Sequence, residues 1–115
     1  MSLSKAERFA EFLRRLAAAP PAGTGEEALE LLMSTLNAVE DAHSGVPFDP
    51  RNWRADGRMY PPEPDSARPV PGRPDLIRYR SRAHNTVIGA DGSIEFLTLR
   101  GESLLRKPGS GTAPP

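Results

Sequence analysis

The sequence predicts an α+β fold, in which an N-terminal antiparallel helical hairpin packs on a three- to four-stranded antiparallel sheet. Three observations lead to this prediction. Two apolar stripes with helical spacing occupy the first 45 residues, strand-forming residues gather over about residues 76–100, and a long proline-rich loop joins the two regions. The chain has 115 residues, which is enough for one small domain, predicted over residues 1–107.

The first helix is predicted over about residues 4–18. Ser4 and Glu7 have the S-x-x-E spacing of a capping box, and Pro20-Pro21 follow where the helix has to end. Apolar residues between these limits recur at the spacing of one helical face. The members of this stripe are Phe9, Phe12, Leu13 and Leu16.

The second helix is predicted over about residues 24–43. Thr24 and Glu27 repeat the capping pattern, and Gly45 suits the helix end. Its apolar stripe consists of Leu29, Leu32, Met33, Leu36 and Val39. The connection to the first helix is short, which favours an antiparallel hairpin. We expect Phe12, Leu16, Leu32 and Leu36 to form the contact between the two helices.

Residues 45–75 are predicted to form a long irregular loop, because eight of the thirteen prolines fall between residues 46 and 74. Phe48, Trp53, Met59 and Tyr60 are large groups that we expect to hold the first half of the loop on the core. Asp56-Gly57 indicates a tight turn, and residues 61–74 indicate an extended polyproline-type crossing.

Strands are predicted over about residues 76–100, with a turn at Asp91-Gly92. A two-residue turn would pair Val87 with Phe96, whereas a three-residue turn with a left-handed Gly92 would pair Ile88 with Ile94. The second arrangement gives better cross-strand pairs and is favoured. A further strand at Asp75–Arg82 would complete a three-stranded meander, and Glu102–Lys107 offers one more strand or a helical turn. The pattern does not fix which sheet face packs inward.

The composition excludes several classes of protein. The chain has no cysteine, so disulfides and thiolate metal sites are excluded, and a reducing cytoplasm suits it. There is no apolar run long enough to span a membrane, and the N-terminus lacks the layout of a secretory signal. No metal-ligand or cofactor motif occurs, so neither a metal nor a cofactor is predicted. Residues 108–115 are rich in glycine and proline and are predicted to be a flexible tail.

The formal charge of zero hides an asymmetry between the two halves of the chain. Residues 1–50 carry −4 and residues 51–115 carry +4, and arginine outnumbers lysine thirteen to two. On an extended strand, Arg78, Arg80, Arg82 and His84 would share one face. Together with Arg58 and Tyr60, they form the predicted binding surface.

Two functions follow from this surface. The first is a small non-enzymatic interaction or accessory protein that binds an acidic protein partner, with a homodimer through a sheet edge left open. Nucleic acid is less favoured, because the strand offers no aromatic stacking platform. The alternative is a toxin-like, metal-independent ribonuclease that uses His84 with Glu40 and Arg80. Against both stands the simpler interpretation that the arginines are the solvated side of an amphipathic strand.

Overall fold

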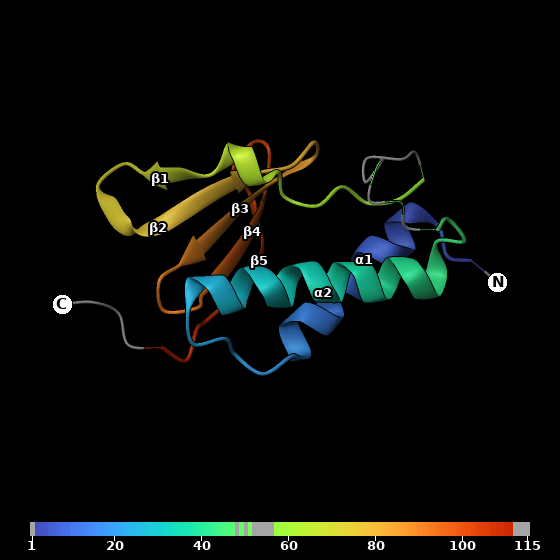
Figure 1. The fold of residues 1–115 in the computed structure, drawn as a ribbon, viewed down its shortest axis with the longest axis horizontal. Helices are drawn as coiled ribbons and strands as arrows, with labels where there is room; N and C mark the ends of the chain where they lie inside the picture. Colours follow the sequence, from blue (N-terminus) through green and yellow to red (C-terminus); the bar gives the residue numbers. More distant parts are fainter. Residues whose placement is uncertain (1, 48, 50, 52–56, 112–115) are drawn as a thin grey trace.

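The computed structural model describes residues 2–47, 49, 51 and 57–111, and it confirms the α+β prediction (Figure 1). Two helices precede one antiparallel sheet, whose five strands lie side by side in chain order. The sheet therefore has one strand more than the upper predicted number. The elements are α1 (Lys5–Ala18), α2 (Gly25–His43), the short 3-10 helix η1 (Pro64–Ser66), β1 (Arg68–Val70), β2 (Arg73–Arg80), β3 (His84–Gly89), β4 (Ile94–Thr98) and β5 (Ser103–Lys107).

The helices begin at the predicted capping residues. Ser4 Oγ accepts a hydrogen bond from the Glu7 backbone N–H at 3.1 Å, and the Glu7 carboxylate accepts one from Ser4 N at 3.0 Å, so the capping box is complete. The second box is only half formed. Thr24 Oγ1 accepts from Glu27 N at 3.1 Å, but the Glu27 carboxylate accepts from Gly23 N instead of Thr24 N.

The register of the central hairpin follows the three-residue turn. Ile88 lies opposite Ile94 and Thr86 opposite Phe96, while Gly92 has a φ of 88°. This left-handed backbone favours glycine, because a side chain there would clash with the backbone. The turn also lies against the loop between the helices, where a Cβ on Gly92 would come within 2.0 Å of Ala22 O.

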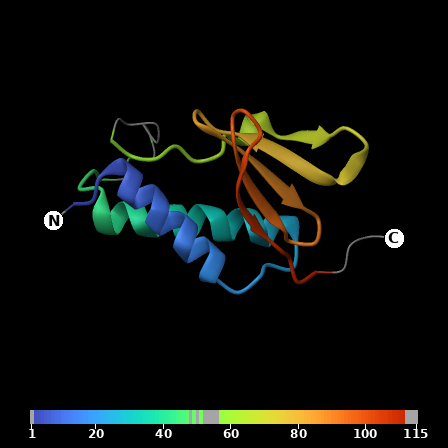
Figure 2. The ribbon, with the colours of Figure 1, turned by 180° about the vertical axis from the view of Figure 1, so that it is seen from behind.

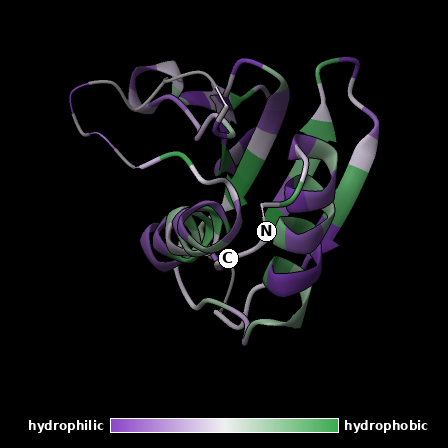
Figure 3. Cartoon of the chain, turned by 90° about the vertical axis from the view of Figure 1, so that its right-hand side faces the viewer, coloured by the Kyte–Doolittle hydropathy of each residue, from purple (hydrophilic) through white to green (hydrophobic). Residues whose placement is uncertain are grey.

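Both helices lie on one side of the sheet in Figures 1 and 2. The buried apolar residues form the core between the helices and that face of the sheet. The four residues expected at the helix–helix contact, Phe12, Leu16, Leu32 and Leu36, are all buried. Ile88, Ile94 and Phe96 supply the sheet side of the same cluster. In Figure 3, hydrophobic and hydrophilic positions alternate along the strands, as expected for a sheet covered on one face.

The predicted proline-rich loop contains more regular secondary structure than expected. Residues 64–80 contain η1, β1 and the whole of β2, which begins at Arg73 and not at Asp75. Pro69 is tolerated because β1 is an edge strand, where a missing N–H costs no ladder bond. Gly72, with a φ of 75°, provides the turn between β1 and β2. The predictions for Phe48, Trp53 and Asp56 concern residues outside the described part of the chain.

The predicted strand Asp75–Arg82 ends earlier, at Arg80. The Ser81 backbone N–H donates to His84 O at 2.9 Å, so the chain reverses over Ser81, Arg82 and Ala83. This was a wrong prediction for Arg82, which lies in the turn and not on a strand. The hairpin moves His84 onto the next strand.

Residues 108–111 of the predicted tail make backbone contacts with the rest of the domain, and residues 112–115 lie outside the described part. Ser110 N donates to Ala22 O at 2.8 Å and Gly111 N donates to Asp91 O at 2.9 Å. Just before this segment, the buried Lys107 ammonium donates to Ala19 O, the carbonyl of the residue that caps α1. The end of the chain thus ties the helical hairpin to the sheet.

Candidate functional site

The reversal at Ser81–Ala83 separates the predicted binding residues onto two sides of the sheet. In β2, Arg78 and Arg80 lie opposite Val87 and Asn85 of β3 and point with them away from the helices. His84 belongs to the other face, together with the buried Thr86 and Ile88. The structure therefore does not bring His84 together with Arg78 and Arg80.

The outer face of the sheet, which neither helix covers, carries a basic cluster at the β1–β2 end. We call Arg68, Arg78 and Arg80 the outer arginine cluster. Arg68 lies directly opposite Arg78, and all three side chains are exposed. Within the described part of the chain, no carboxylate lies within ion-pair distance of any of the three. The guanidinium of Arg68 donates only to the backbone carbonyls of residues 65 and 67.

The rest of the outer face differs in character. A shallow pocket of about 230 Å³ adjoins Arg78 and is lined by half-buried apolar side chains of Val70, Val87 and Leu97. Farther along the sheet, Arg106 is paired with Glu95 at 2.9 Å. The face thus combines unpaired cations with an apolar hollow beside them.

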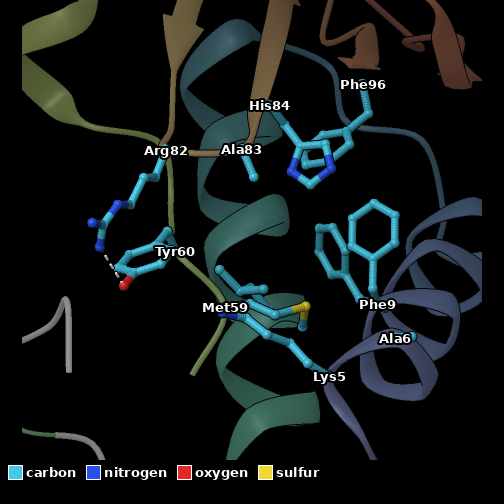
Figure 4. A pocket seen from close by; sticks show the side chains of 11 residues that line it. Lys5, Ala6, Phe9, Met59, Tyr60, Arg82, Ala83, His84 and Phe96 are labelled. Carbon is cyan, nitrogen blue, oxygen red and sulfur yellow. Dashed lines mark hydrogen bonds between the residues drawn. The ribbon is translucent and has the colours of Figure 1, made fainter. Parts of the chain in front are cut away.

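A second, larger pocket lies on the opposite side, between the helices and the sheet, and encloses about 470 Å³ (Figure 4). It contains three of the predicted binding residues: Tyr60, Arg82 and His84. We call it the His84 pocket. Its floor is apolar and consists of Phe9, Phe12, Leu36, Met59 and Phe96.

His84 lies against two of these rings. Its imidazole stacks on Phe9 with a centroid distance of 4.7 Å and an interplanar angle of 9°, and it lies 5.0 Å from Phe96. Desolvation by burial lowers the pKa of His84, because the apolar surroundings disfavour the charged ring. In the described part of the chain the two ring nitrogens have no hydrogen-bond partner.

The rim of the pocket is cationic. Arg82 Nη1 donates to Tyr60 Oη at 2.8 Å, and the guanidinium carbon lies 5.1 Å from the centroid of the Tyr60 ring. Lys5 Nζ lies over the same ring, also at 5.1 Å. Among the described residues that line the pocket there is no aspartate or glutamate.

The two remaining predicted residues, Arg58 and Glu40, are buried in a polar network apart from this pocket. Glu40 accepts from Arg8 Nε at 2.6 Å and from Met59 N at 2.8 Å. Arg58 donates to Val46 O at 2.6 Å and to Asp41 at 3.0 Å. Both side chains hold the segment before Tyr60 on α2. No group of three metal-ligating side chains occurs among residues that the structure describes.

Sequence reasoning missed Lys5 and Arg68 as site residues and assigned Phe9 only to the core. Phe9 carried a signal, since it opens the predicted apolar stripe of the first helix. Lys5 carried none, because its approach to Tyr60 and Arg82 depends on the tertiary fold.

Comparison with protein-family models, with curated proteins and with solved structures found no match. None of the described helices is long and apolar enough to cross a membrane.

Proposed function

We propose that this protein is a non-enzymatic interaction module that binds an acidic segment of a partner protein on the outer arginine cluster. One observation carries the proposal. Arg68 and Arg78 face each other across neighbouring strands, with Arg80 two residues along, and none has an ion-pair partner in the part of the chain described.

Such an arrangement is unfavourable for the isolated protein. Like charges directly opposite on two strands lie with Cβ atoms about 4.5–5.5 Å apart and destabilise the sheet. Alternate residues of one strand are separated by roughly 6.6 Å, so Arg80 adds to the repulsion. Water screens these charges, but carboxylates placed between them would turn the repulsion into attraction. An acidic partner therefore complements the outer arginine cluster.

The apolar hollow beside Arg78 favours a protein partner over a nucleic acid. Val70, Val87 and Leu97 offer a place for an aliphatic side chain between acidic residues. The outer face has no aromatic ring on β2, β3 or β4, because Tyr79 and Phe96 lie on the helix side. A stacking platform for bases is thus missing from these strands.

The internal rival to this proposal is pairing between the arginines and the acidic helices. Both helices lie on the opposite face of the sheet, and two of their acidic side chains pair within the helical hairpin, Glu40 with Arg8 and Glu11 with Arg14. The outer arginine cluster therefore stays available to a ligand.

The arrangement gives less support to the ribonuclease alternative. That chemistry needs a second acid–base group near His84 and cations around the phosphate. The described residues that line the His84 pocket include no carboxylate and no second histidine. Of its other two proposed members, Arg80 points to the opposite side of the sheet, and Glu40 is occupied by Arg8.

Fluorescence anisotropy with labelled peptides tests the proposal. The probe is a peptide of alternating glutamate and leucine, and its control has glutamine in place of glutamate. We expect binding of the acidic peptide only, with an affinity that falls as salt is raised. Arg78→Glu with Arg80→Glu should abolish binding and leave the melting temperature nearly unchanged. The matched control, Arg14→Glu with Arg51→Glu, makes the same charge change at exposed positions elsewhere.

Four results would overturn the proposal. Equal binding of the glutamine peptide would remove the role of charge, and binding that survives Arg78→Glu with Arg80→Glu would remove the site. In a separate arm with labelled RNA and EDTA, cleavage that is lost in His84→Ala would replace the proposal by the ribonuclease alternative. Tighter binding of RNA than of the acidic peptide would reassign the outer face to nucleic acid.

A further inference from the structure

The His84 pocket is a second concavity with chemistry of its own. It lies on the side of the sheet opposite to the outer arginine cluster, and the interaction proposed above makes no use of it. Its volume, about 470 Å³, lies within the range typical of sites for small organic ligands. Its lining combines apolar side chains with a few polar groups at one end, which is also typical of such sites.

We propose that the His84 pocket binds a small amphipathic carboxylate, with the apolar tail on the aromatic floor and the carboxylate at Lys5 and Arg82. A small molecule is favoured over a partner helix, because α1, the Met59–Tyr60 segment and the β2–β3 turn bound the pocket on separate sides (Figure 4). A helix would need an open groove instead.

The apolar floor of the pocket is suited to the apolar tail of the ligand. Phe9, Phe12 and Phe96 come within 6.4 Å of one another, measured between ring centroids, and Met59 and Leu36 complete the surface. The thioether of methionine adapts to ligands of different shape. An alkyl or aryl tail placed there would remove apolar surface of both partners from water.

The cationic rim of the pocket is suited to the carboxylate head group of the ligand. Lys5 comes from the first turn of α1 and Arg82 from the β2–β3 turn, yet both lie 5.1 Å from the centroid of one ring, that of Tyr60. Neither has an ion-pair partner in the part of the chain described. The rim therefore carries two positive charges, and a carboxylate that reaches it would accept charge-assisted hydrogen bonds from these cations.

His84 adds a neutral donor at the junction of floor and rim. Stacking on Phe9 fixes the plane of its ring, and its nitrogens have no partner among the described residues. A neutral imidazole carries one N–H, which suits a carboxylate oxygen or a polar atom near the head of the ligand. The orientation of this donor is set by packing before a ligand arrives, which lowers the entropic cost of binding.

Isothermal titration of the full chain with octanoate tests the proposal, with octanol and octylamine as controls for the head group. We expect octanoate to bind about tenfold more tightly than octanol, and octylamine not to bind. Lys5→Gln with Arg82→Gln should weaken octanoate about tenfold, to the level of octanol. In NMR spectra, octanoate should shift the ring signals of Tyr60 and His84.

A blocking variant locates the binding. Ala6 is exposed and lines the pocket, so Ala6→Trp should fill the cavity and abolish binding of octanoate. The matched control is Ala18→Trp, an exposed position at the other end of α1 that does not line the pocket. Circular dichroism checks that both variants are folded.

The proposal is overturned if octanoate and octanol bind equally, if neither binds, or if octanoate still binds Ala6→Trp. Arg78→Glu with Arg80→Glu should bind octanoate as the unmodified protein does. A failure of the acidic-peptide experiment is therefore distinguishable from a failure of this one.

Discussion

Arg8 of α1 and Glu40 of α2 form a buried ion pair, with 2.6 Å between Nε and Oε1 and exposed fractions of 5 % and 1 %. The remaining atoms of the pair are also bonded. The Arg8 guanidinium donates to Leu3 O and Gly57 O, and Glu40 Oε2 accepts from Met59 N. The pair thus connects α1 with three other parts of the chain: the residues before α1, the second helix and the segment leading to Tyr60.

Removing one member of this pair should be strongly destabilising. Glu40→Gln or Arg8→Met leaves a buried charge or donor without its partner, and we expect a loss of about 3–5 kcal/mol in the free energy of unfolding. Arg8→Met combined with Glu40→Leu should lose clearly less than the sum of the single substitutions. Urea unfolding measures all of these variants. Strictly additive losses would show that the two side chains do not act as a pair.

Leu32 tests the contact between the helices. Its side chain is fully buried among Phe12, Leu16 and Leu36, so Leu32→Ala should leave a cavity and cost about 2–5 kcal/mol. The control is Leu104→Ala on β5, where the side chain is 40 % exposed and the loss should be much smaller. Equal thermal midpoints for the two variants would be incompatible with the core described above.

His84 should make stability depend on pH. Its pKa is lowered by burial in the fold, so the unfolded chain binds a proton more readily as the pH falls below about 6.5. The unfolded state is then favoured, and stability decreases from about pH 6.5 down to the pKa of the folded protein. Lys5 and Arg82, the other charged groups of the pocket, are cations and do not stabilise a proton on the ring.

Urea unfolding of the protein and of His84→Phe between about pH 8 and pH 5 isolates this effect. Phenylalanine keeps an aromatic ring against Phe9 but does not titrate. We expect the two stability curves to run parallel above about pH 7 and to diverge below pH 6.5, where only the protein with His84 loses stability through this site. His43 is present in both proteins and cancels in the comparison. Parallel curves over the whole range would exclude a lowered pKa.

The free edge of β5 predicts a homodimer. The other edge, β1, is protected by its short length and by Pro69, whereas a bulge occurs in the outermost pairing at both edges. β5 has five residues without proline, and it exposes Leu104. Light scattering over a range of concentrations should show growth above the monomer mass of 12.5 kDa. Leu104→Lys should shift the protein toward the monomer, and a strict monomer at high concentration would contradict the prediction.

The features that the sequence predicts well are local ones. Ser4 and Glu7 cap a helix by contacts three residues apart, and the Ile88–Ile94 pair follows from one turn around Gly92. These depend on neighbours in the chain, so a pattern can reveal them. The helical stripes likewise contain most of the buried residues of both helices, but not Arg8, Ala28 and Glu40.

The features that were missed depend on distant partners. Pro69 lies in a strand only because β2 accepts it at an edge, and nothing in residues 61–74 announces that pairing. The turn at Ser81–Ala83 lacks glycine, proline and asparagine, so the sequence gives no signal for it. The alternating arginines therefore predicted a strand that extends beyond its true end. The contact of Lys5 with the Tyr60 ring depends on the tertiary fold and leaves no trace in local spacing.

The bond from Lys107 to Ala19 has a consequence for biosynthesis. It joins residues 88 positions apart. The backbone hydrogen bonds of Ser110 and Gly111 form at the same end of the molecule. At a synthesis rate of about 5–20 residues per second, the first helix waits roughly 4–18 s for this partner after its own C-terminal residues have been added. During that interval the apolar faces of both helices lack the strands that cover them. The nascent chain is therefore expected to need protection from a chaperone until its last strand has left the ribosome.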